Sequence, residues 1–415
     1  MNVLTKKNKN LQLITKWKDS NRRQLITVLE KRKVRHLKNG EILVEVLYVP
    51  THGSFWLAVH PDAIHPRCDE FMRDGSFVFG NGAVGRVIDK SKDVNNIGIG
   101  DYVCVYGHYP CNHADCNSCT VQQRYIECQY GEGKIIGHGN GAEDGTFAKY
   151  VILPDKTWEK CFSKNENPTQ EQIRPFMFAY LVADVRNALT RHQNYYKGKN
   201  ILLIGGGLSS HIAVSLINRD IPDAKLFILE VDKKKVESIK NISTCPIDSY
   251  IIENDDLIKM KNVRLTKKNE PRKNWLIKDF ESRMREHFEG EKCDFLVDFS
   301  SGESSALWFN PMILSPGTIC TIFGFGLNQI TLDSELLKLS GLTVQISRGP
   351  GNRQNRMEVI KYMKEGGGQF INDNIIGNLK YFSSINEFSE YVDSCLEPTP
   401  NNLYSIEHAY FCPYE

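Results

Sequence analysis

The sequence predicts an α/β protein of two domains, the first rich in β-strands and the second a doubly wound parallel sheet. The first half contains short β-branched and aromatic runs that glycine or proline interrupts. The second half alternates buried strands with helices, beginning with NILLIGGGLSSHIAVSLI. A chain of 415 residues is long for one core and comfortable for two, so we expect a cleft between the domains where a small ligand binds.

The composition is that of an ordinary globular protein, with 41% hydrophobic residues, 25% charged residues and a net charge of +2. Neither nucleic acid nor membrane is expected as the main partner. The N-terminus is lysine-rich without the apolar core of a secretory signal, and no apolar run approaches the roughly 20 residues of a membrane span. We therefore expect a cytoplasmic protein whose 12 cysteines are thiols and metal ligands rather than a disulfide framework.

The predicted elements follow one another in two blocks. A helix entered through Pro175, PFMFAYLVADVRNALTRH, separates the blocks. The basic segment Lys259 to Trp275 is interpreted as a solvated surface insertion rather than a docking patch. The predicted strands are EILVEVLYV, FVFGNGAVGRVI, GDYVCVYG and FAKYVILP before this helix, and NILLI, KLFILE, CDFLVDF, GTICTIFGFG and LTVQIS after it.

Two glycines after the strand 201–204 predict a dinucleotide site. Gly205 permits a tight turn, and Gly207 lets the backbone approach a pyrophosphate at the helix N-terminus. Ser210 stands at the third position of the G-x-G-x-x-G motif and is still small. Glu230 ends the next strand at the spacing expected of an acidic residue that binds ribose hydroxyls. The predicted cofactor-binding residues are Gly205, Gly207, Leu208, Ser209, Glu230, Phe323 and Gly324.

Glu230 also predicts which cofactor is used. Its carboxylate would repel the 2′-phosphate of NADP(H), and no arginine follows it immediately, so NAD(H) is expected to be preferred. The three lysines at positions 233 to 235 oppose this preference, because a lysine could still reach a phosphate.

The segment CNHADCNSCTVQQRYIEC predicts a structural zinc lobe at about residues 108–130. Zn²⁺ accepts four thiolates in a tetrahedron, and the short spacings let one loop wrap around the ion. The segment has little apolar content, so the metal would supply the missing stability. The expected ligands are Cys111, Cys116, Cys119 and Cys128, with His113 as a competing first ligand. A site closed by four thiolates is structural rather than catalytic.

With these pieces in order, the chain resembles the medium-chain dehydrogenase/reductase superfamily, the zinc-type alcohol and polyol dehydrogenases. The resemblance extends from about Gly40 to about Cys395 and includes GTFAKYVILP, LSPGTICTIFGFG and GLTVQISRGPGNRQNRMEVIKYMKEGG. It implies a GroES-like catalytic domain at residues 1–178 and 348–415 and a Rossmann NAD-binding domain at 179–347. It also implies a homodimer formed by pairing Rossmann sheets edge to edge, for which GTICTIFGFG is apolar enough.

The resemblance also implies where a catalytic zinc would bind. The family's ligands are a cysteine in a Cys-Gly-Thr-Asp-like turn, a histidine in a Gly-His-Glu turn, and a cysteine or glutamate that starts the central helix. The matching residues here are His52 in THGSF, Asn81 in GNG and Tyr180. A carboxamide is a poor zinc ligand, so no stable catalytic zinc is expected. Only Cys68, Asp69 and Glu70 lie near enough in sequence to replace the missing ligands.

Without zinc, side chains must polarise the substrate oxygen. By resemblance Ser54 takes the position of the proton-relay hydroxyl. His52 can shuttle a proton near neutral pH, while Asn81 and Tyr180 can donate hydrogen bonds to an oxyanion. Asp184 follows Tyr180 by one helical turn and could stabilise NAD⁺, accept a proton or orient His52.

Each of these side chains also has a purely structural interpretation. His52 could be a hydrogen-bonded structural histidine, Asn81 could hold a turn, and Tyr180 could be a core aromatic residue. Asp184 could be a solvated helix residue or pair with Arg174 or Arg186.

The leading hypothesis is an NAD(H)-dependent oxidoreductase that exchanges hydride with a secondary alcohol or ketone carbon without a catalytic zinc. A polar substrate, sugar-like or cyclitol-like, would suit the pocket. A zinc-free reductase of an activated C=C bond is the alternative enzyme. A catalytically silent NAD(H)-binding protein is the alternative from another class, because all three ligand types are lost together.

Overall fold

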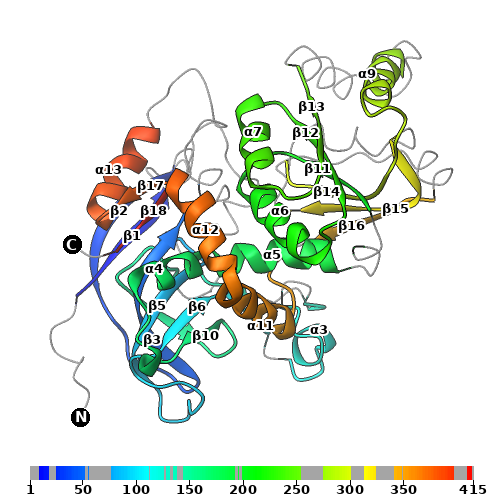
Figure 1. Ribbon diagram of the computed structural model, residues 1–415. Helices are drawn as coiled ribbons and strands as arrows, with labels where there is room; N and C mark the ends of the chain where they lie inside the picture. Colours follow the sequence, from blue (N-terminus) through cyan, green and yellow to red (C-terminus); the bar gives the residue numbers. More distant parts are fainter. Residues whose placement is uncertain are drawn as a thin grey trace. The chain divides into compact units, whose positions relative to one another are not determined.

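The computed structural model describes residues 9–17, 25–51, 55, 76–111, 113–125, 128–130, 134–137, 144–191, 195, 199–253, 274–300, 313–323, 341–347, 349–396 and 409–413. The chain forms two compact units (Figure 1). The first combines Met1–Ala183 with Gly349–Glu415, and the second is Asp184–Arg348. The basic segment that begins at Lys259 lies outside the described residues as far as residue 273.

The first unit is built mainly of antiparallel strands. Its central sheet has seven strands in the order β10-β6-β5-β3-β18-β17, and β9 also pairs with β3. Most residues of β3 are buried because it lies in the middle of this sheet. The strands of the unit are β1 (Lys9–Trp17), β2 (Leu25–Lys33), β3 (Glu41–Pro50), β4 (Ser76–Val78), β5 (Ala83–Lys90), β6 (Tyr102–Val105), β7 (His108–Tyr109), β8 (Lys134–Ile135), β9 (Tyr150–Pro154), β10 (Trp158–Phe162), β17 (Lys380–Phe382) and β18 (Ala409–Phe411).

A hairpin precedes the part of the chain that the resemblance covers. Strands β1 and β2 pair antiparallel along their whole length, and β1 pairs with β4 on its other side. Apolar side chains of β1, among them Leu13 and Ile14, are almost fully buried in the core of the first unit. Strand β1 therefore belongs to the first unit together with its partner β2.

The predicted strand FVFGNGAVGRVI is divided in the structure. Its first part is β4, which joins the three-stranded sheet with β1 and β2. Its second part is β5, which joins the central sheet. The division falls at the glycine pair that interrupts this segment, because the backbone turns at Gly80, whose φ of +101° favours glycine. Asn81 lies in this turn.

The helices of the first unit are short, apart from α5, α11 and α13. The predicted helix from Pro175 begins as a 3₁₀ helix (Arg174–Phe178) and continues as α5 (Ala179–Thr190), which crosses the division between the units. The others are α3 (Asn117–Thr120), α4 (Gln170–Ile173), α11 (Arg353–Tyr362), α12 (Gly368–Asn374) and α13 (Ile385–Leu396), with 3₁₀ helices at Lys164–Glu166 and Ile376–Asn378 and a π-helical stretch at Met363–Gly367.

The second unit is a parallel sheet of six strands in the order β13-β12-β11-β14-β15-β16. This is the doubly wound arrangement, because the order reverses at β11. Helices α6 and α7 lie beside the strands in Figure 1. The elements are β11 (Asn200–Ile204), α6 (Leu208–Asp220), β12 (Lys225–Glu230), α7 (Lys233–Ile242), β13 (Ile247–Ile251), α9 (Asn274–His287), β14 (Cys293–Asp298), β15 (Leu314–Phe323) and β16 (Thr343–Ser347).

One strand assignment needs correction. GTICTIFGFG was expected to lie at the sheet edge, but its strand, β15, lies between β14 and β16. Residues 318–323 of this strand are all buried, as a strand inside a parallel sheet covered on both faces requires. Among the strands that the structure describes, β16 ends the sheet on that side, and its Ile346 is 63% exposed.

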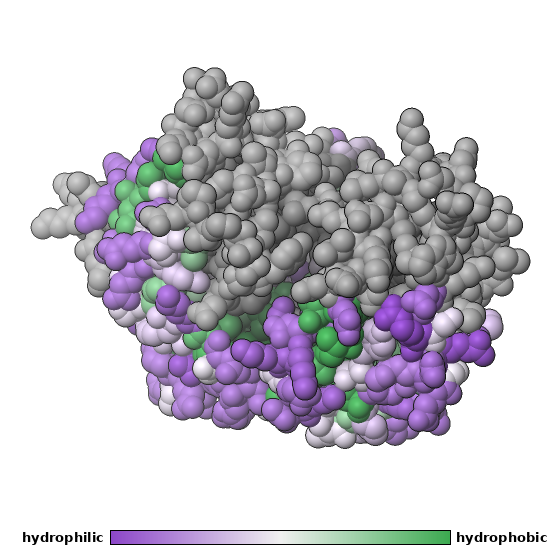
Figure 2. Space-filling model, turned by 90° about the horizontal axis from the view of Figure 1, so that it is seen from above, coloured by the Kyte–Doolittle hydropathy of each residue, from purple (hydrophilic) through white to green (hydrophobic). Residues whose placement is uncertain are grey.

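The polarity of the visible surface agrees with the composition of the sequence. On the face in Figure 2 the described residues present mostly hydrophilic side chains, with hydrophobic ones in separate patches. Within the described part of the chain, no helix combines the length and the apolar content that crossing a membrane requires.

Candidate active site

The glycine turn after β11 contacts the acidic end of β12. Gly205 has φ of +91°, and an added Cβ atom would lie 3.1 Å from the amide nitrogen of Ser300. Glu230 is buried, and one of its carboxylate oxygens accepts the amide N–H of Gly206. Its other oxygen accepts the amide N–H of Val231 at 2.7 Å. The structure therefore brings the predicted ribose-binding carboxylate against the predicted phosphate-binding turn.

Gly206 stands at the variable position between the first two glycines of the G-x-G-x-x-G motif. An added Cβ atom would lie 2.9 Å from the Glu230 carboxylate and 3.0 Å from Cβ of Lys235. At Gly207 an added Cβ atom would meet nothing within 4 Å. The room beside Gly207, at the N-terminus of α6, fits a group that approaches the backbone closely, as a pyrophosphate does.

A histidine fixes this turn from the helix side. His211 Nδ1 lies 3.0 Å from the carbonyl oxygen of Gly207, and its Nε2 lies 2.9 Å from Ser238 Oγ on α7. Because a carbonyl only accepts, Nδ1 carries the proton and Nε2 accepts from the serine hydroxyl. Burial lowers the pKa of His211, which favours this neutral form. His211 belongs to none of the motifs that predicted the dinucleotide site.

The remaining predicted cofactor residues lie at element ends. Leu208 and Ser209 form the first turn of α6. Phe323 ends β15, and its ring lies 5.1 Å from that of Phe299, just beyond β14. Gly324 lies outside the described residues.

Asn81 is held in a turn that glycines surround in the first unit. Asn81 is 6% exposed. Added Cβ atoms at Gly137 and Gly145 would lie 2.4 and 2.3 Å from the carbonyl oxygen of Gly80. Thr146 donates its amide to that oxygen at 2.9 Å and its hydroxyl to the Gly82 carbonyl at 3.0 Å. Close backbone packing thus fixes the turn that presents Asn81.

The segment Gly107–His108 connects Asn81 with Tyr180. An added Cβ atom at Gly107 would lie 2.6 Å from the carbonyl oxygen of Asn81 and 2.9 Å from its Cβ. The next residue, His108, is 2% exposed, and its ring stacks on the ring of Tyr180, with 5.5 Å between centroids and 4° between planes. Two predicted catalytic residues therefore share a neighbour that the sequence analysis missed.

The turn THGSF is described only at its flanks. Thr51 Oγ1 donates to the carbonyl oxygen of Ala409 at 3.0 Å. Phe55 is 2% exposed, and its ring meets that of Phe79 at 5.2 Å. Phe79 immediately precedes the turn that holds Asn81, so the two predicted catalytic turns are linked through one aromatic contact. His52 and Ser54 lie outside the described residues, as do Cys68, Asp69 and Glu70.

Asp184 follows Tyr180 by one turn of α5 and is half-buried. Tyr180 is buried at 7% exposure, as either a core aromatic residue or a pocket residue would be. The catalytic roles of both stay predictions.

The four cysteines converge in the first unit. Their four sulfur atoms lie within 4.8 Å of one another. The single turn of α3 places Cys116 and Cys119, whose backbones are joined by a hydrogen bond of 3.1 Å. Four Zn–S bonds in a tetrahedron put the sulfurs about 3.8 Å apart, and Cys116 and Cys128 show that separation, 3.8 Å between Sγ atoms. The donor set fits Zn²⁺, with all four thiols as ligands.

His113 lies differently from the cysteines. Its ring stacks on Tyr130 at 4.2 Å, and the Tyr130 hydroxyl donates to Asp115 at 2.5 Å. The thiol environments are also unequal. Burial raises the pKa of Cys116, but amide donors at Cys119 and Gln129 outweigh it and lower the pKa to about 7. The stacking of His113 on Tyr130 and the convergence of the four sulfur atoms favour Cys111 over His113 as the fourth ligand.

A buried ion pair attaches the cysteine lobe to the core of the first unit. Arg356 on α11 is 1% exposed and donates from Nε and Nη2 to Glu159 Oε1 on β10, at 3.1 and 3.0 Å. Its guanidinium lies 5.8 Å from the ring centroid of Tyr125, in the lobe, and 5.6 Å from that of Tyr106. Cation–π contacts thus join the lobe, through Tyr125, to Arg356 on α11, which also contacts Tyr106 just after β6.

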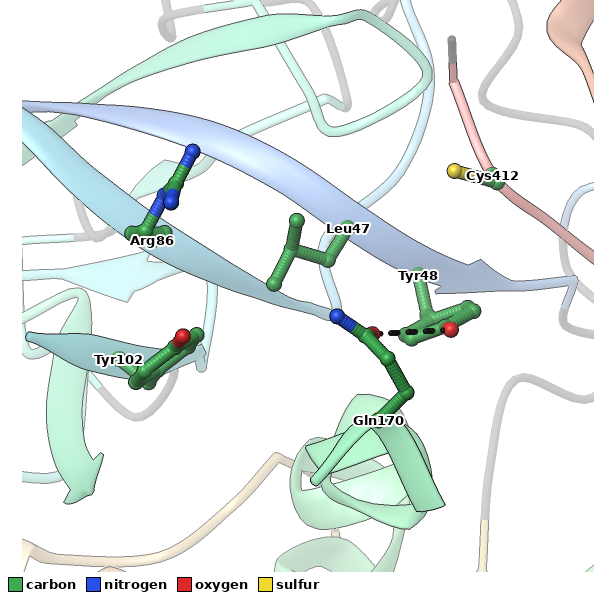
Figure 3. A pocket seen from close by; sticks show the side chains of 6 residues that line it. All are labelled: Leu47, Tyr48, Arg86, Tyr102, Gln170 and Cys412. Atoms are coloured by element: carbon green, nitrogen blue, oxygen red, sulfur yellow. Dashed lines mark hydrogen bonds between the residues drawn. The ribbon is translucent and has the colours of Figure 1, made fainter. Parts of the chain in front are cut away.

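A separate pocket of about 320 Å³ lies on the first unit (Figure 3). Tyr48 donates its hydroxyl to Gln170 Oε1 at 3.0 Å in this pocket. Arg86 is neutralised by Glu45, which lies 2.7 Å away. None of the predicted catalytic or cofactor residues lines the pocket, whose walls are formed by Leu47, Tyr48, Arg86, Tyr102, Gln170 and Cys412.

Comparison with known proteins identifies the first unit. Residues 38–163 match the alcohol dehydrogenase GroES-like domain family. A segment of 116 residues is 32% identical to L-threonine 3-dehydrogenase of Streptomyces coelicolor, covering 28% of this chain and 30% of that relative. Residues 38–163 are thus similar to alcohol dehydrogenases, and the match spans about a third of the length of the curated relative.

Solved structures of dehydrogenases share the fold over nearly the whole chain. Galactitol-1-phosphate dehydrogenase from Escherichia coli has a TM-score of 0.67 and 15% identity over 97% of this chain and 99% of that one. A short chain alcohol dehydrogenase from E. coli CFT073, complexed with NADH, has a TM-score of 0.68 and 14% identity over 98% of this chain and 100% of that one. The predicted pairing of a GroES-like domain with a parallel-sheet Rossmann domain is confirmed.

Proposed function

We propose that this protein is a medium-chain dehydrogenase/reductase and an NAD(H)-dependent oxidoreductase. It transfers hydride between nicotinamide and a secondary alcohol or ketone carbon of a small polar substrate, without a catalytic zinc. The contact between the Glu230 carboxylate and the amide of Gly206 carries the proposal. An acidic side chain held against an open glycine turn is the arrangement that binds a ribose diol beside a pyrophosphate.

The same contact supports NAD(H) over NADP(H). Glu230 and Asp232 place two carboxylates at the end of β12, where a 2′-phosphate would approach. Lys235 has its Cβ 3.0 Å from an added Cβ at Gly206, so one lysine stem does lie beside the turn. The structural relative from E. coli CFT073 was solved with NADH.

The relatives support a polar alcohol as substrate. L-Threonine 3-dehydrogenase and galactitol-1-phosphate dehydrogenase are named for a hydroxy amino acid and a sugar alcohol phosphate. A secondary carbinol flanked by polar groups would suit a pocket that contains an amide, a phenol and a carboxylate.

The chemistry without zinc is assigned to side chains. Asn81 and Tyr180 donate hydrogen bonds to the substrate oxygen, on which negative charge develops. His52 and Ser54 relay its proton, and Asp184 stabilises the charge that forms on oxidised nicotinamide. The buried, glycine-packed turn supports Asn81 in this role, because a donor preorganised by rigid backbone loses little energy in reorientation.

The proposal includes one structural zinc per chain at the four cysteines and a homodimer. When bound, the zinc would hold the lobe folded and would take no part in the reaction. Strand β16 is the candidate pairing edge for the dimer, since Ile346 is exposed on it.

Turnover in two variants tests the function. NADH oxidation is followed against ketones and NAD⁺ reduction against secondary alcohols, with enones as the competing substrate class. His52→Ala and Asp184→Asn are expected to abolish turnover while leaving the NADH dissociation constant unchanged. His36→Ala and Asp223→Asn, both at exposed positions, are the matched controls. Retained turnover in both test variants would contradict the assignment, and preference for enones would favour a C=C reductase.

A further inference from the structure

The segment Gly107–His108 has no role in the function proposed above. It contacts Asn81 on one side and Tyr180 on the other, and these two side chains are the proposed donors to the substrate oxygen. Its position follows from the end of β6, after which the chain turns at Gly107 with φ of +68°. The carbonyl oxygen of Gly107 accepts the amide of Ile136 at 2.8 Å, so the segment is fixed by backbone contacts.

The imidazole of His108 is held in a single orientation. Its Nδ1 lies 3.0 Å from the carbonyl oxygen of Tyr106, and the backbone amide of His108 donates to the same oxygen at 2.8 Å. A carbonyl cannot donate, so Nδ1 carries a proton. The ring is also 2% exposed, which leaves it little room to rotate.

The orientation of the imidazole determines the plane of the neighbouring phenol. The rings of His108 and Tyr180 are parallel within 4° at a centroid distance of 5.5 Å, an offset stack. Tyr180 stands in the first turn of α5, so its ring is attached to a helix while the stacking partner is attached to a strand. A phenol that is clamped in this way directs its hydroxyl along one line, as a preorganised donor must.

We propose that His108 is the positioning residue for Tyr180, acting through the flat face of its ring. This inference rests on the proposed function, in which the Tyr180 hydroxyl donates to the substrate oxygen. The ring provides the stack, while the nitrogen Nδ1 only fixes the orientation of the ring. The Tyr106 carbonyl keeps the amide of residue 108 as a donor whichever side chain stands there, so replacing the imidazole leaves no buried acceptor without a partner.

Two substitutions separate the ring from its nitrogen. His108→Phe keeps a flat ring and removes the donor, whereas His108→Asn keeps a donor and removes the ring. Displacement of a catalytic group by about 1 Å costs up to about 100-fold in rate, so kcat of His108→Asn is expected to fall by about tenfold or more. His108→Phe should stay within about threefold of wild type on the same scale. The NADH dissociation constant should be unchanged in both, which also shows that each variant is folded.

A double-mutant cycle shows whether His108 acts through the phenol. Tyr180→Phe removes the hydroxyl, after which the orientation of the ring no longer affects kcat. His108→Asn should therefore lower kcat in the wild type but not in the Tyr180→Phe background. Equal losses in both backgrounds, or a His108→Phe variant as slow as His108→Asn, would overturn the positioning role.

The inference and the proposed function fail in different ways. Turnover in the wild type with unchanged kcat in every His108 variant would overturn the inference alone. NADH binding without turnover in the wild type, across alcohols, ketones and enones, would overturn the proposed function and this role with it. His113→Asn is the matched control, because that histidine also stacks on a tyrosine, Tyr130, but in the cysteine lobe.

Discussion

Gly107 packs directly on Asn81, so closely that any Cβ atom at position 107 would lie 2.6 Å from the carbonyl oxygen of Asn81. The turn that carries Asn81 is therefore held by residues distant in the sequence, and the position of the carboxamide depends on a side chain being absent.

Gly107→Ala is expected to displace the Asn81 turn. The added methyl group must shift the backbone of Asn81, and φ of +68° is strained for alanine, so stability should fall by about 2 kcal/mol or more. Turnover should fall with it. Gly290→Ala is the matched control, because Gly290 has φ of +74° but open space at its Cβ position. Equal losses of stability in the two variants, measured by urea unfolding, would mean that the contact with Asn81 adds nothing.

Two neighbouring glycines should respond differently to alanine. Gly206→Ala places a methyl group 2.9 Å from the Glu230 carboxylate and should reduce both stability and NADH affinity. Gly207→Ala meets nothing within 4 Å and has an ordinary φ of −77°, so stability should be unchanged. NADH affinity should still fall tenfold or more, about 1.4 kcal/mol, because the methyl group occupies the room of the pyrophosphate. Unchanged NADH affinity in Gly207→Ala, measured by fluorescence titration, would place the cofactor elsewhere.

Removal of one thiol should release the structural zinc. Elemental analysis of untagged wild-type protein is expected to show one zinc per chain, and Cys116→Ser should show none together with a lower melting temperature. Cys395→Ser, a partly buried cysteine of α13, is the control and should keep its zinc. Two zinc ions in the wild type, one of them retained in Cys116→Ser, would show that a catalytic metal exists despite Asn81.

Removing one member of the buried ion pair of Glu159 and Arg356 should lower the stability more than removing both members. Arg356→Leu leaves a buried carboxylate whose remaining ion-pair partner, among the residues that the structure describes, is the more distant Arg353, and removing one partner of such a pair costs about 3–5 kcal/mol. The double variant Glu159→Leu/Arg356→Leu should recover most of this loss, since no buried charge remains. A double variant no more stable than Arg356→Leu in chemical unfolding would show that the pair matters chiefly through packing on Tyr106 and Tyr125.

Acid should weaken the hydrogen bonds by which the Asp101 carboxylate connects the backbone at Gly98 with the backbone at Lys164. Burial raises the pKa of Asp101, but the amide donors of Lys164 and Gly98 and the Lys160 ammonium lower it further, so the pKa lies below its ordinary value of 3.8. Its contribution to stability is therefore complete above about pH 4 and is lost as the pH falls through the folded-state pKa. Asp101→Asn should be less stable than wild type at neutral pH, with a difference that shrinks below pH 4. A pH-independent difference, with Asp223→Asn as control, would contradict this linkage.

Periodicity and glycine spacing predicted most of the fold. Strands β11 and β12 with the turn between β11 and α6 follow the sequence directly, since their signals are local. The four cysteines could be predicted as a cluster because short spacings force them together. The division of FVFGNGAVGRVI between two sheets was not predicted, because alternating apolar residues do not show which sheet a strand joins.

The candidate catalytic site was only partly predictable. Asn81 and Tyr180 were predicted because they occupy positions implied by the family resemblance, and their catalytic roles stay predictions, whereas His108 occupies none of these positions. Its proposed positioning role depends on contacts with residues 27 and 72 positions away in sequence, at Asn81 through Gly107 and at Tyr180. The glycine before it is the one local signal that the backbone turns there. Gly206 was passed over for a similar reason, because the motif treats it as a variable position.

The N-terminal hairpin changes how the limits of this domain should be drawn. The match to the GroES-like family begins at residue 38, after both β1 and β2. However, β1 itself pairs with β4, and β4 leads into the turn that carries Asn81. A fragment trimmed to the family limits would expose to water the core residues that Leu13 and Ile14 cover, and it would leave β4 as an unpaired strand edge beside the Asn81 turn. The match to the GroES-like family therefore delimits a shorter segment than the one that folds, and the hairpin is an integral part of the first unit.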